Sequence, residues 1–129
     1  MPHSITPLLR AQLLAELQVL RDQILQYLEA DHATEYQQLR LQLAQQPLSH
    51  WPELMQHWLT PELQQKCRRL SLVQAALSQM DMGLYGLCSD CESRIERTLL
   101  QEDPARQRCA ACEQIHQDQR NQQMPLRSR

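Results

Sequence analysis

The feature that most constrains this chain is a pair of Cys-x2-Cys motifs near its carboxyl terminus. Four of its five cysteines stand at Cys88, Cys91, Cys109 and Cys112, with seventeen residues between the two pairs. Structural Zn²⁺ takes four thiolate or imidazole ligands in a tetrahedron, and each Cys-x2-Cys turn supplies one edge of it. The spacing therefore predicts one structural Zn²⁺ held by these four cysteines. Such a closed site leaves no open coordination position for catalysis.

Alternative roles at this cluster concern its ligands and its redox chemistry. Zinc thiolates can be oxidised with release of the metal, so redox sensing is a competing role. His116, one helical turn after the last cysteine, is a substitute ligand to be weighed against the four thiols. The fifth cysteine, Cys67, has no neighbouring His or Cys and is expected to pack on a helix.

The chain has two glycines, Gly83 and Gly86, and both stand just before the first motif. So few glycines argue against an all-β fold, which needs many turns. Abundant Leu, Gln, Glu, Ala and Arg favour helices instead. We expect Gly83 to end a helix at positive φ, and Gly86 to let the chain bend into the first motif.

A long amino-terminal helix is predicted from Leu8 to about Ala44, a stretch without Gly or Pro. Thr6-Pro7 is a good helix start. Leucine and isoleucine recur there mostly at spacings of three and four, and the pattern weakens over residues 29–35. A single helix of this length would reach roughly 55 Å. It must therefore pack against a second helix.

The second helix is predicted by an apolar repeat that alternates steps of four and three up to Gly83, as in the seam of a coiled coil. Arg68 and Arg69 fall off this seam and are expected to face water. If the two helices are antiparallel with aligned ends, the turn lies near residue 45, where Pro47 interrupts the pattern. The predicted seam consists of Leu59, Leu63, Lys66, Leu70, Val73, Leu77, Met80 and Leu84.

The predicted fold is therefore mainly α. A long antiparallel helical hairpin (a coiled coil) covers residues 1–82, with its tip at about 45–59. A small four-Cys zinc-finger globule with a short C-terminal helix covers 83–122, and a tail covers 123–129. The tip contains Trp51 and Trp58, which are expected either to bury the end of the hairpin or to form a contact surface for a partner.

Composition excludes several classes of function. A net charge of −2 and a pI of about 6.2 do not provide the basic face that DNA binding needs. No apolar run approaches the roughly 20 residues of a membrane span, and the first residues do not resemble a signal peptide. No Ser/His/Asp arrangement, phosphate-binding loop or open metal site points to an enzyme. We therefore expect a cytoplasmic, monomeric protein that binds neither DNA nor membranes, although self-association through the seam stays open.

A helical hairpin followed by G-x-Y-G-x-C-x2-C-x17-C-x2-C resembles the DksA/TraR family of bacterial transcription factors. The resemblance is specific over about residues 81–117 and only architectural over the hairpin. It implies a regulator that binds RNA polymerase directly, with the globule on the polymerase rim and the coiled coil in the secondary channel. The matching residues are Gly83, Tyr85, Gly86, the four cysteines, Leu100 and Pro104.

Two departures from the family pattern are visible. Well-studied members carry D-x-x-D-x-A at the tip, whereas the tip predicted here has no aspartate and only Glu53 nearby. The family's site for the alarmone ppGpp uses basic residues at positions matched by Gln65, Leu72 and Glu113, so we expect no alarmone binding of that kind. The expected tip contacts are Leu48, Ser49, His50, Trp51 and Glu53. An alternative is an interaction protein of another class whose hairpin binds a partner other than polymerase.

Overall fold

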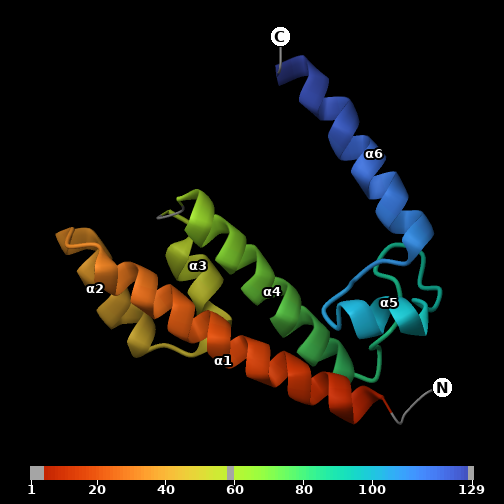
Figure 1. The fold of residues 1–129 in the computed structure, drawn as a ribbon, viewed down its shortest axis with the longest axis horizontal. Helices are drawn as coiled ribbons and strands as arrows, with labels where there is room; N and C mark the ends of the chain where they lie inside the picture. The colour runs from red at the N-terminus through yellow and green to blue at the C-terminus, as the bar shows by residue number, and fades with distance from the viewer. Residues whose placement is uncertain (1–4, 58–59, 128–129) are drawn as a thin grey trace.

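The computed structural model describes residues 5–57 and 60–127 of the chain, with the backbone alone over 123–127. The fold is mainly α (Figure 1), and within these residues the extended backbone forms one antiparallel bridge, between Leu87 and Arg94. None of the described helices combines the length and apolarity needed to cross a bilayer. The elements are α1 (Thr6–Ala30), α2 (Thr34–Ala44), the 3-10 turn η1 (Leu48–His50), α3 (Trp51–Met55), α4 (Pro61–Asp81), α5 (Arg97–Glu102) and α6 (Ala110–Arg127).

Helices α1 and α4 form the predicted antiparallel hairpin. Each has Pro in its first turn, and the Thr60 side chain caps α4 by accepting from the Leu63 N–H at 3.3 Å. The side-chain contacts between them follow opposite orders along the two helices, which confirms the antiparallel register. These contacts are Tyr27–Thr60 (2.9 Å), Gln23–Lys66 (3.3 Å) and Arg10–Asp81 (3.0 Å).

The predicted seam of the second helix is largely confirmed. Leu63, Leu70 and Val73 are fully buried, and so is Ala76, which the four-three pattern missed. Leu84 is 48% exposed because α4 ends at Asp81 and the chain then turns away. Leu59 lies outside the described residues. On α1 the facing residues are Leu9, Leu13, Leu20, Ile24 and Leu28, all buried.

The prediction of one helix from Leu8 to Ala44 is wrong, because α1 ends at Ala30. Asp31 and Ala33 have extended backbones, and the Asp31 carboxylate accepts from the Ala33 N–H at 2.9 Å. The Gln37 side chain then donates to the carbonyls of Leu28 (3.1 Å) and Asp31 (2.6 Å). These bonds satisfy groups that a helix end leaves unpaired, so they stabilise the break.

After the break the chain turns back along the hairpin. Figure 1 shows α2 lying beside α1, and contacts continue from α2 to α3 and from α3 to α4. We call α2, η1 and α3, with the parts of α1 and α4 that they cover, the distal head. We call residues 31–33 the distal turn, which is the end of the hairpin farthest from α5 (Figure 1). The buried core of the head consists of Ile24, Leu28, Leu39, Leu43, Trp51, Met55 and Leu63.

Trp51 is a core residue of this head. Its side chain is 1% exposed, and its indole N–H donates to the carbonyl of Gln46 at 3.1 Å. Of the two interpretations of the tryptophans, burial is therefore confirmed for Trp51. Trp58 lies outside the described residues.

The carboxyl-terminal helix α6 projects away from the globule (Figure 1). It is longer than the short helix expected, since it continues through residues 123–127 of the expected tail. Ile115, one turn into α6, is 56% exposed.

Candidate metal centre

Two glycines shape the entry to the four cysteines, as their positions predicted. Gly83 has a φ of 74°. The carboxyl-terminal end of α4 is capped by the Leu84 N–H, which donates to the Gln79 carbonyl at 2.8 Å. Gly86 has φ of 89°, and its carbonyl accepts from the Ile95 N–H at 2.7 Å. Both values lie in the left-handed region that only glycine adopts without strain.

The first Cys-x2-Cys turn is closed by its own backbone. The Cys88 N–H donates to the Ser93 carbonyl at 2.8 Å, and the Glu92 N–H donates to the Cys88 carbonyl at 3.0 Å. The Asp90 N–H lies 3.4 Å from the Cys88 Sγ, in position to donate to it. Glu92 has φ of 63°, the one non-glycine residue of the described ranges in that region. The tight turn brings Cys88 and Cys91 to the same side.

The second Cys-x2-Cys turn is the start of a helix. Cys109 stands just before α6, its carbonyl accepts from the Glu113 N–H at 2.9 Å, and its Sγ accepts from the Cys112 N–H at 3.4 Å. The Ser89 N–H donates to the Gln107 carbonyl at 2.8 Å, which ties the first turn to the approach of the second.

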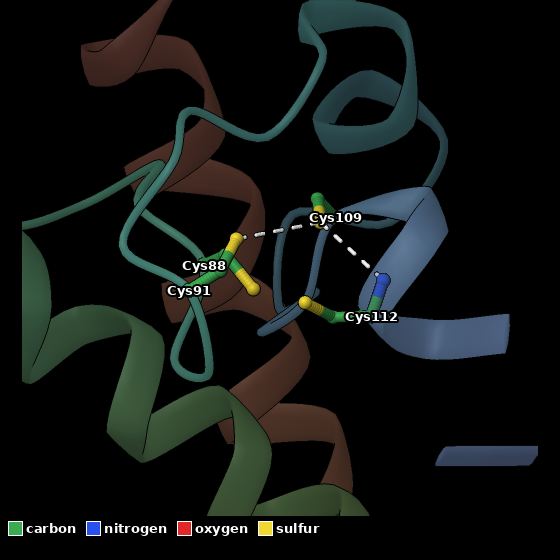
Figure 2. Close-up of side chains that lie close together, drawn as sticks. All are labelled: Cys88, Cys91, Cys109 and Cys112. Atoms are coloured by element: carbon green, nitrogen blue, oxygen red, sulfur yellow. Dashed lines mark hydrogen bonds between the residues drawn. The ribbon is translucent and has the colours of Figure 1, made fainter. Parts of the chain in front are cut away.

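The four cysteines form a metal-binding group. Figure 2 shows their side chains gathered from the two turns, and all four Sγ atoms lie within 4.8 Å of one another. The Sγ atoms of Cys91 and Cys109 are 3.8 Å apart, too far for a disulfide. A tetrahedron with metal–sulfur bonds of about 2.3 Å has edges of about 3.8 Å. The cluster therefore fits one tetrahedral ion, as predicted.

Neither His116, the substitute ligand considered from the sequence, nor Cys67 belongs to this group. His116 is not among the ligands that the described residues bring together, and Cys67 is half-buried on α4. Burial raises the pKa of the Cys67 thiol, which keeps it neutral. This agrees with the packing role expected for it.

The sulfurs affect one another's ionisation. Desolvation raises the pKa of the Cys88 thiol, but hydrogen bonds from the backbone of Cys109, Cys91 and Asp90 lower it to about 6. The pKa of Cys112 is raised, first by its hydrogen bond with Cys109 and then by those with Cys91 and Cys88. Four adjacent thiolates therefore need a cation between them.

A small core supports the two turns. Ile95, Leu100 and Ala105 are buried beneath them, and a Cβ on Gly86 would stand 3.6 Å from Leu100 Cδ1. The Tyr85 hydroxyl donates to the Pro104 carbonyl at 2.8 Å, and burial, with the nearby Asp103 carboxylate, raises its pKa to about 12. Leu100 and Pro104, matched to the family by sequence, thus hold the globule together.

An arginine network joins the hairpin to the globule. Arg69 of α4 contacts Glu16 of α1 at 2.5 and 2.9 Å, and its other N–H groups donate to Asp103 at 2.8 and 3.1 Å. The Arg69 side chain is 29% exposed, so the expectation that it faces water is wrong. Sequence reasoning missed this role because the apolar repeat describes only how the two hairpin helices pair. Asp103 contacts α4 from the globule, which the repeat does not include.

We expect Arg69→Met to lower the free energy of unfolding by about 1–2 kcal/mol, because it leaves two half-buried carboxylates without their partner. Arg68→Met is the matched control, since Arg68 is exposed, and it should change stability by less than about 0.5 kcal/mol. Urea unfolding at neutral pH measures both. Equal effects of the two variants would contradict a structural role for the network.

The same network makes the stability sensitive to acid. Burial raises the pKa of Asp103, but the hydrogen bonds from Arg69 and the Ala105 N–H outweigh it and hold the pKa below its usual range. A lowered carboxyl pKa contributes stability that is present above the unfolded value, near 3.9, and lost as pH falls through the folded value. Asp103→Asn should therefore reduce the slope of stability against pH below about 4.

Comparison with known proteins identifies the architecture. No family model matches the chain, and no curated protein matches it by sequence. Among solved structures, the transcription factor DksA2 from Pseudomonas aeruginosa superposes with a TM-score of 0.59 at 18% identity, over 94% of this chain and 89% of that one. This chain has the DksA2 fold. The resemblance inferred from the Cys-x2-Cys motifs is thus confirmed at the level of the fold.

With the DksA-like fold established, the distal turn changes the interpretation of the tip. It consists of Asp31, His32 and Ala33, which match the second half of the D-x-x-D-x-A pattern, with Leu28 in place of the first aspartate. Sequence reasoning missed this match because it placed the tip at 45–59. The weakened apolar pattern over residues 29–35 was the signal that marked the turn.

The residues expected at the tip lie on the distal head instead. Ser49, His50 and Glu53 are exposed, and Leu48 is half-buried. Trp51, being buried, has no surface to offer a partner. Partner binding by the four accessible residues stays a prediction.

Proposed function

We propose that this protein is a DksA-like transcription regulator of the DksA/TraR family that binds RNA polymerase directly. The hairpin would enter the secondary channel with its distal turn leading, and the globule would stay on the rim. The observation that supports this most is the DksA2 fold over nearly the whole chain, with a projecting hairpin. The protein would act in the cytoplasm as a monomer, by contact rather than by catalysis.

The metal in this proposal is a single structural Zn²⁺. Four thiolates are the donor set that zinc takes in closed sites, and the 3.8 Å separation of Cys91 and Cys109 suits its bond length. Bound there, the ion would link the first turn to α6 and so fix the globule. It would leave no coordination position for a substrate.

An acidic distal turn would replace the acid-free tip expected from the sequence. Asp31 carries the carboxylate within the turn, and Glu29 and Glu35 are exposed on either side of it. The family resemblance implies that tip acids act near the catalytic magnesium of polymerase. We infer that Asp31, with these two flanking glutamates, fills that role here.

The alarmone expectation also stands as part of this proposal. The α4 positions matched to the family's basic residues hold Gln65 and Leu72, and Leu72 is 40% exposed. Glu113 carries a negative charge and lies 3.8 Å from Arg108. A phosphate-rich ligand would find no cluster of cations at these positions.

Photocrosslinking tests the partner and the orientation together. A photoreactive residue at His32, which is exposed, should crosslink to core RNA polymerase, and a known secondary-channel factor should compete with it. The same residue at Gln114 of α6 is the matched control, and it should not label the interior of the channel. Labelling from Gln114 but not from His32 would overturn the proposed orientation.

The effect of the distal acid is measured separately. Asp31→Asn should retain polymerase binding but reduce the effect on open-complex lifetime at a responsive promoter severalfold. Glu53→Gln, on the head but away from the turn, should keep the wild-type effect. If both variants regulate as wild type does, the acidic turn has no role in the channel.

The alternative function is an interaction protein with a partner other than polymerase. The observation that favours it is the distal head, because α2 and α3 make that end broader than a two-helix rod. It predicts that purified core polymerase does not retain the protein in a pull-down. The alternative is excluded if core polymerase still retains a tip variant of the protein and a known secondary-channel factor displaces that variant.

A further inference from the structure

A cavity of about 700 Å³ lies where the hairpin meets the globule. The hairpin contributes Thr6 at the start of α1 and Met80 near the end of α4, and the globule contributes Ile95 and Leu100 among others. Its size falls within the range of about 300–1,000 Å³ typical of small-molecule sites. It is separate from the four sulfurs, none of which lines it.

The cavity wall is mostly apolar. Met80, Leu87, Ile95 and Leu100 line it. Tyr85 lines it as well, and its hydroxyl is already hydrogen-bonded to the Pro104 carbonyl. Met82 and Leu84, the sequence neighbours of the lining residue Gly83, are 63% and 48% exposed.

Two arginines give the cavity its charge. Arg94 and Arg97 both line it, and none of the described residues that line it is acidic. Neither guanidinium forms an ion pair or a side-chain hydrogen bond with the described part of the chain. This contrasts with Arg10, Arg69 and Arg108, each of which contacts a carboxylate.

We propose that this cavity binds a small amphipathic anion, with its apolar body against Met80, Ile95 and Leu100 and its carboxylate paired with Arg94 and Arg97. Guanidinium groups bind carboxylates through charge-assisted hydrogen bonds, and apolar walls exclude a purely polar ion. The ligand class is therefore a medium-chain aliphatic or aryl monocarboxylate. This inference goes beyond polymerase binding and does not depend on it.

Binding at this position would also couple the two halves of the protein. Because the walls come from both hairpin and globule, a ligand contacts both and stabilises their relative placement. The ligand should therefore raise the melting temperature of the intact protein.

The two glycines provide an internal probe. Gly83 and Gly86 are the only glycines of the chain, and both line the cavity. Their amide signals in a ¹H–¹⁵N spectrum should move as octanoate is added to the zinc-loaded full-length protein. Octanamide, which has the same chain without the charge, should shift them more weakly.

The variants separate charge from shape. The double variant Arg94→Ala/Arg97→Ala should weaken octanoate binding on the order of tenfold and leave octanamide unchanged. Thr6→Trp, which fills the cavity from the start of α1, should weaken both. Arg68→Ala removes an exposed arginine outside the cavity and should weaken neither.

Some outcomes would overturn the proposal. One is that the glycine signals do not move at saturating octanoate, and another is that octanoate and octanamide bind equally well. Equal loss of octanoate binding in the double variant and in Arg68→Ala would show a nonspecific charge effect. Each of these results excludes an anion site in this cavity.

Discussion

Replacing Cys88 with serine should abolish stoichiometric metal binding and unfold the globule while most of the hairpin stays helical. Cys88 is the most buried of the four cysteines, at 2% exposure, and its sulfur accepts from the Asp90 backbone. Structural zinc contributes on the order of 10 kcal/mol in zinc-finger peptides. The globule's own core holds few large apolar side chains, each worth about 1.5–3 kcal/mol, so it cannot replace that contribution.

The measurement combines metal analysis with spectroscopy. Metal content should fall from one ion per chain to less than half, and the amide signals of Gly86 and of Ile95 should collapse toward random-coil positions. Circular dichroism should lose only a minor part of its helical signal, because α1 and α4 pair through their own seam.

Cys67→Ser is the matched control, since it makes the same chemical change on α4 outside the cluster. Cys67 is half-buried, so the change should cost no more than about 1 kcal/mol and leave the metal content unaltered. If Cys88→Ser keeps one tightly bound ion and the wild-type melting temperature, the four-Cys site is not structural.

The metal centre was predictable from sequence because its signal is local. Two Cys-x2-Cys turns specify their own ligand geometry, and Gly83 and Gly86 mark the bend that leads into them. The metal needs only that the two turns meet, and a loop of seventeen residues allows that. No residue far away in the chain is needed to specify the site.

The distal end of the hairpin was not predictable by the same reasoning. Apolar spacing showed that α1 and α4 pair, and the antiparallel register is correct, but periodicity does not show where the chain reverses. The break at Asp31 depends on two polar side chains, Asp31 and Gln37, that bond to nearby backbone. Whether the helix continues or breaks at this point is decided by a few side-chain hydrogen bonds to the backbone, which the spacing of leucines does not reveal.

Trp51→Ala should be the most damaging single change in the distal head, lowering the free energy of unfolding by about 3–5 kcal/mol. Trp51 is 1% exposed and belongs to the buried apolar cluster, and its helix α3 contacts α2 and α4, so its removal leaves a cavity in a small core. It also leaves the Gln46 carbonyl without the indole N–H that donates to it at 3.1 Å.

Trp51→Phe distinguishes packing from hydrogen bonding, because it keeps most of the ring volume and loses the N–H. We expect it to cost less than half as much as Trp51→Ala, since the cavity term is the larger one. Hydrogen exchange should show the loss of protection confined to α2 and α3, with α4 beyond Leu70 protected as in the wild type. If Trp51→Ala instead leaves the distal head protected, Trp51 is not part of the core of the head. The other interpretation of the residue, as a contact for a partner, would then apply. The metal content should be unchanged in both variants, since the globule lies at the other end of the hairpin (Figure 1).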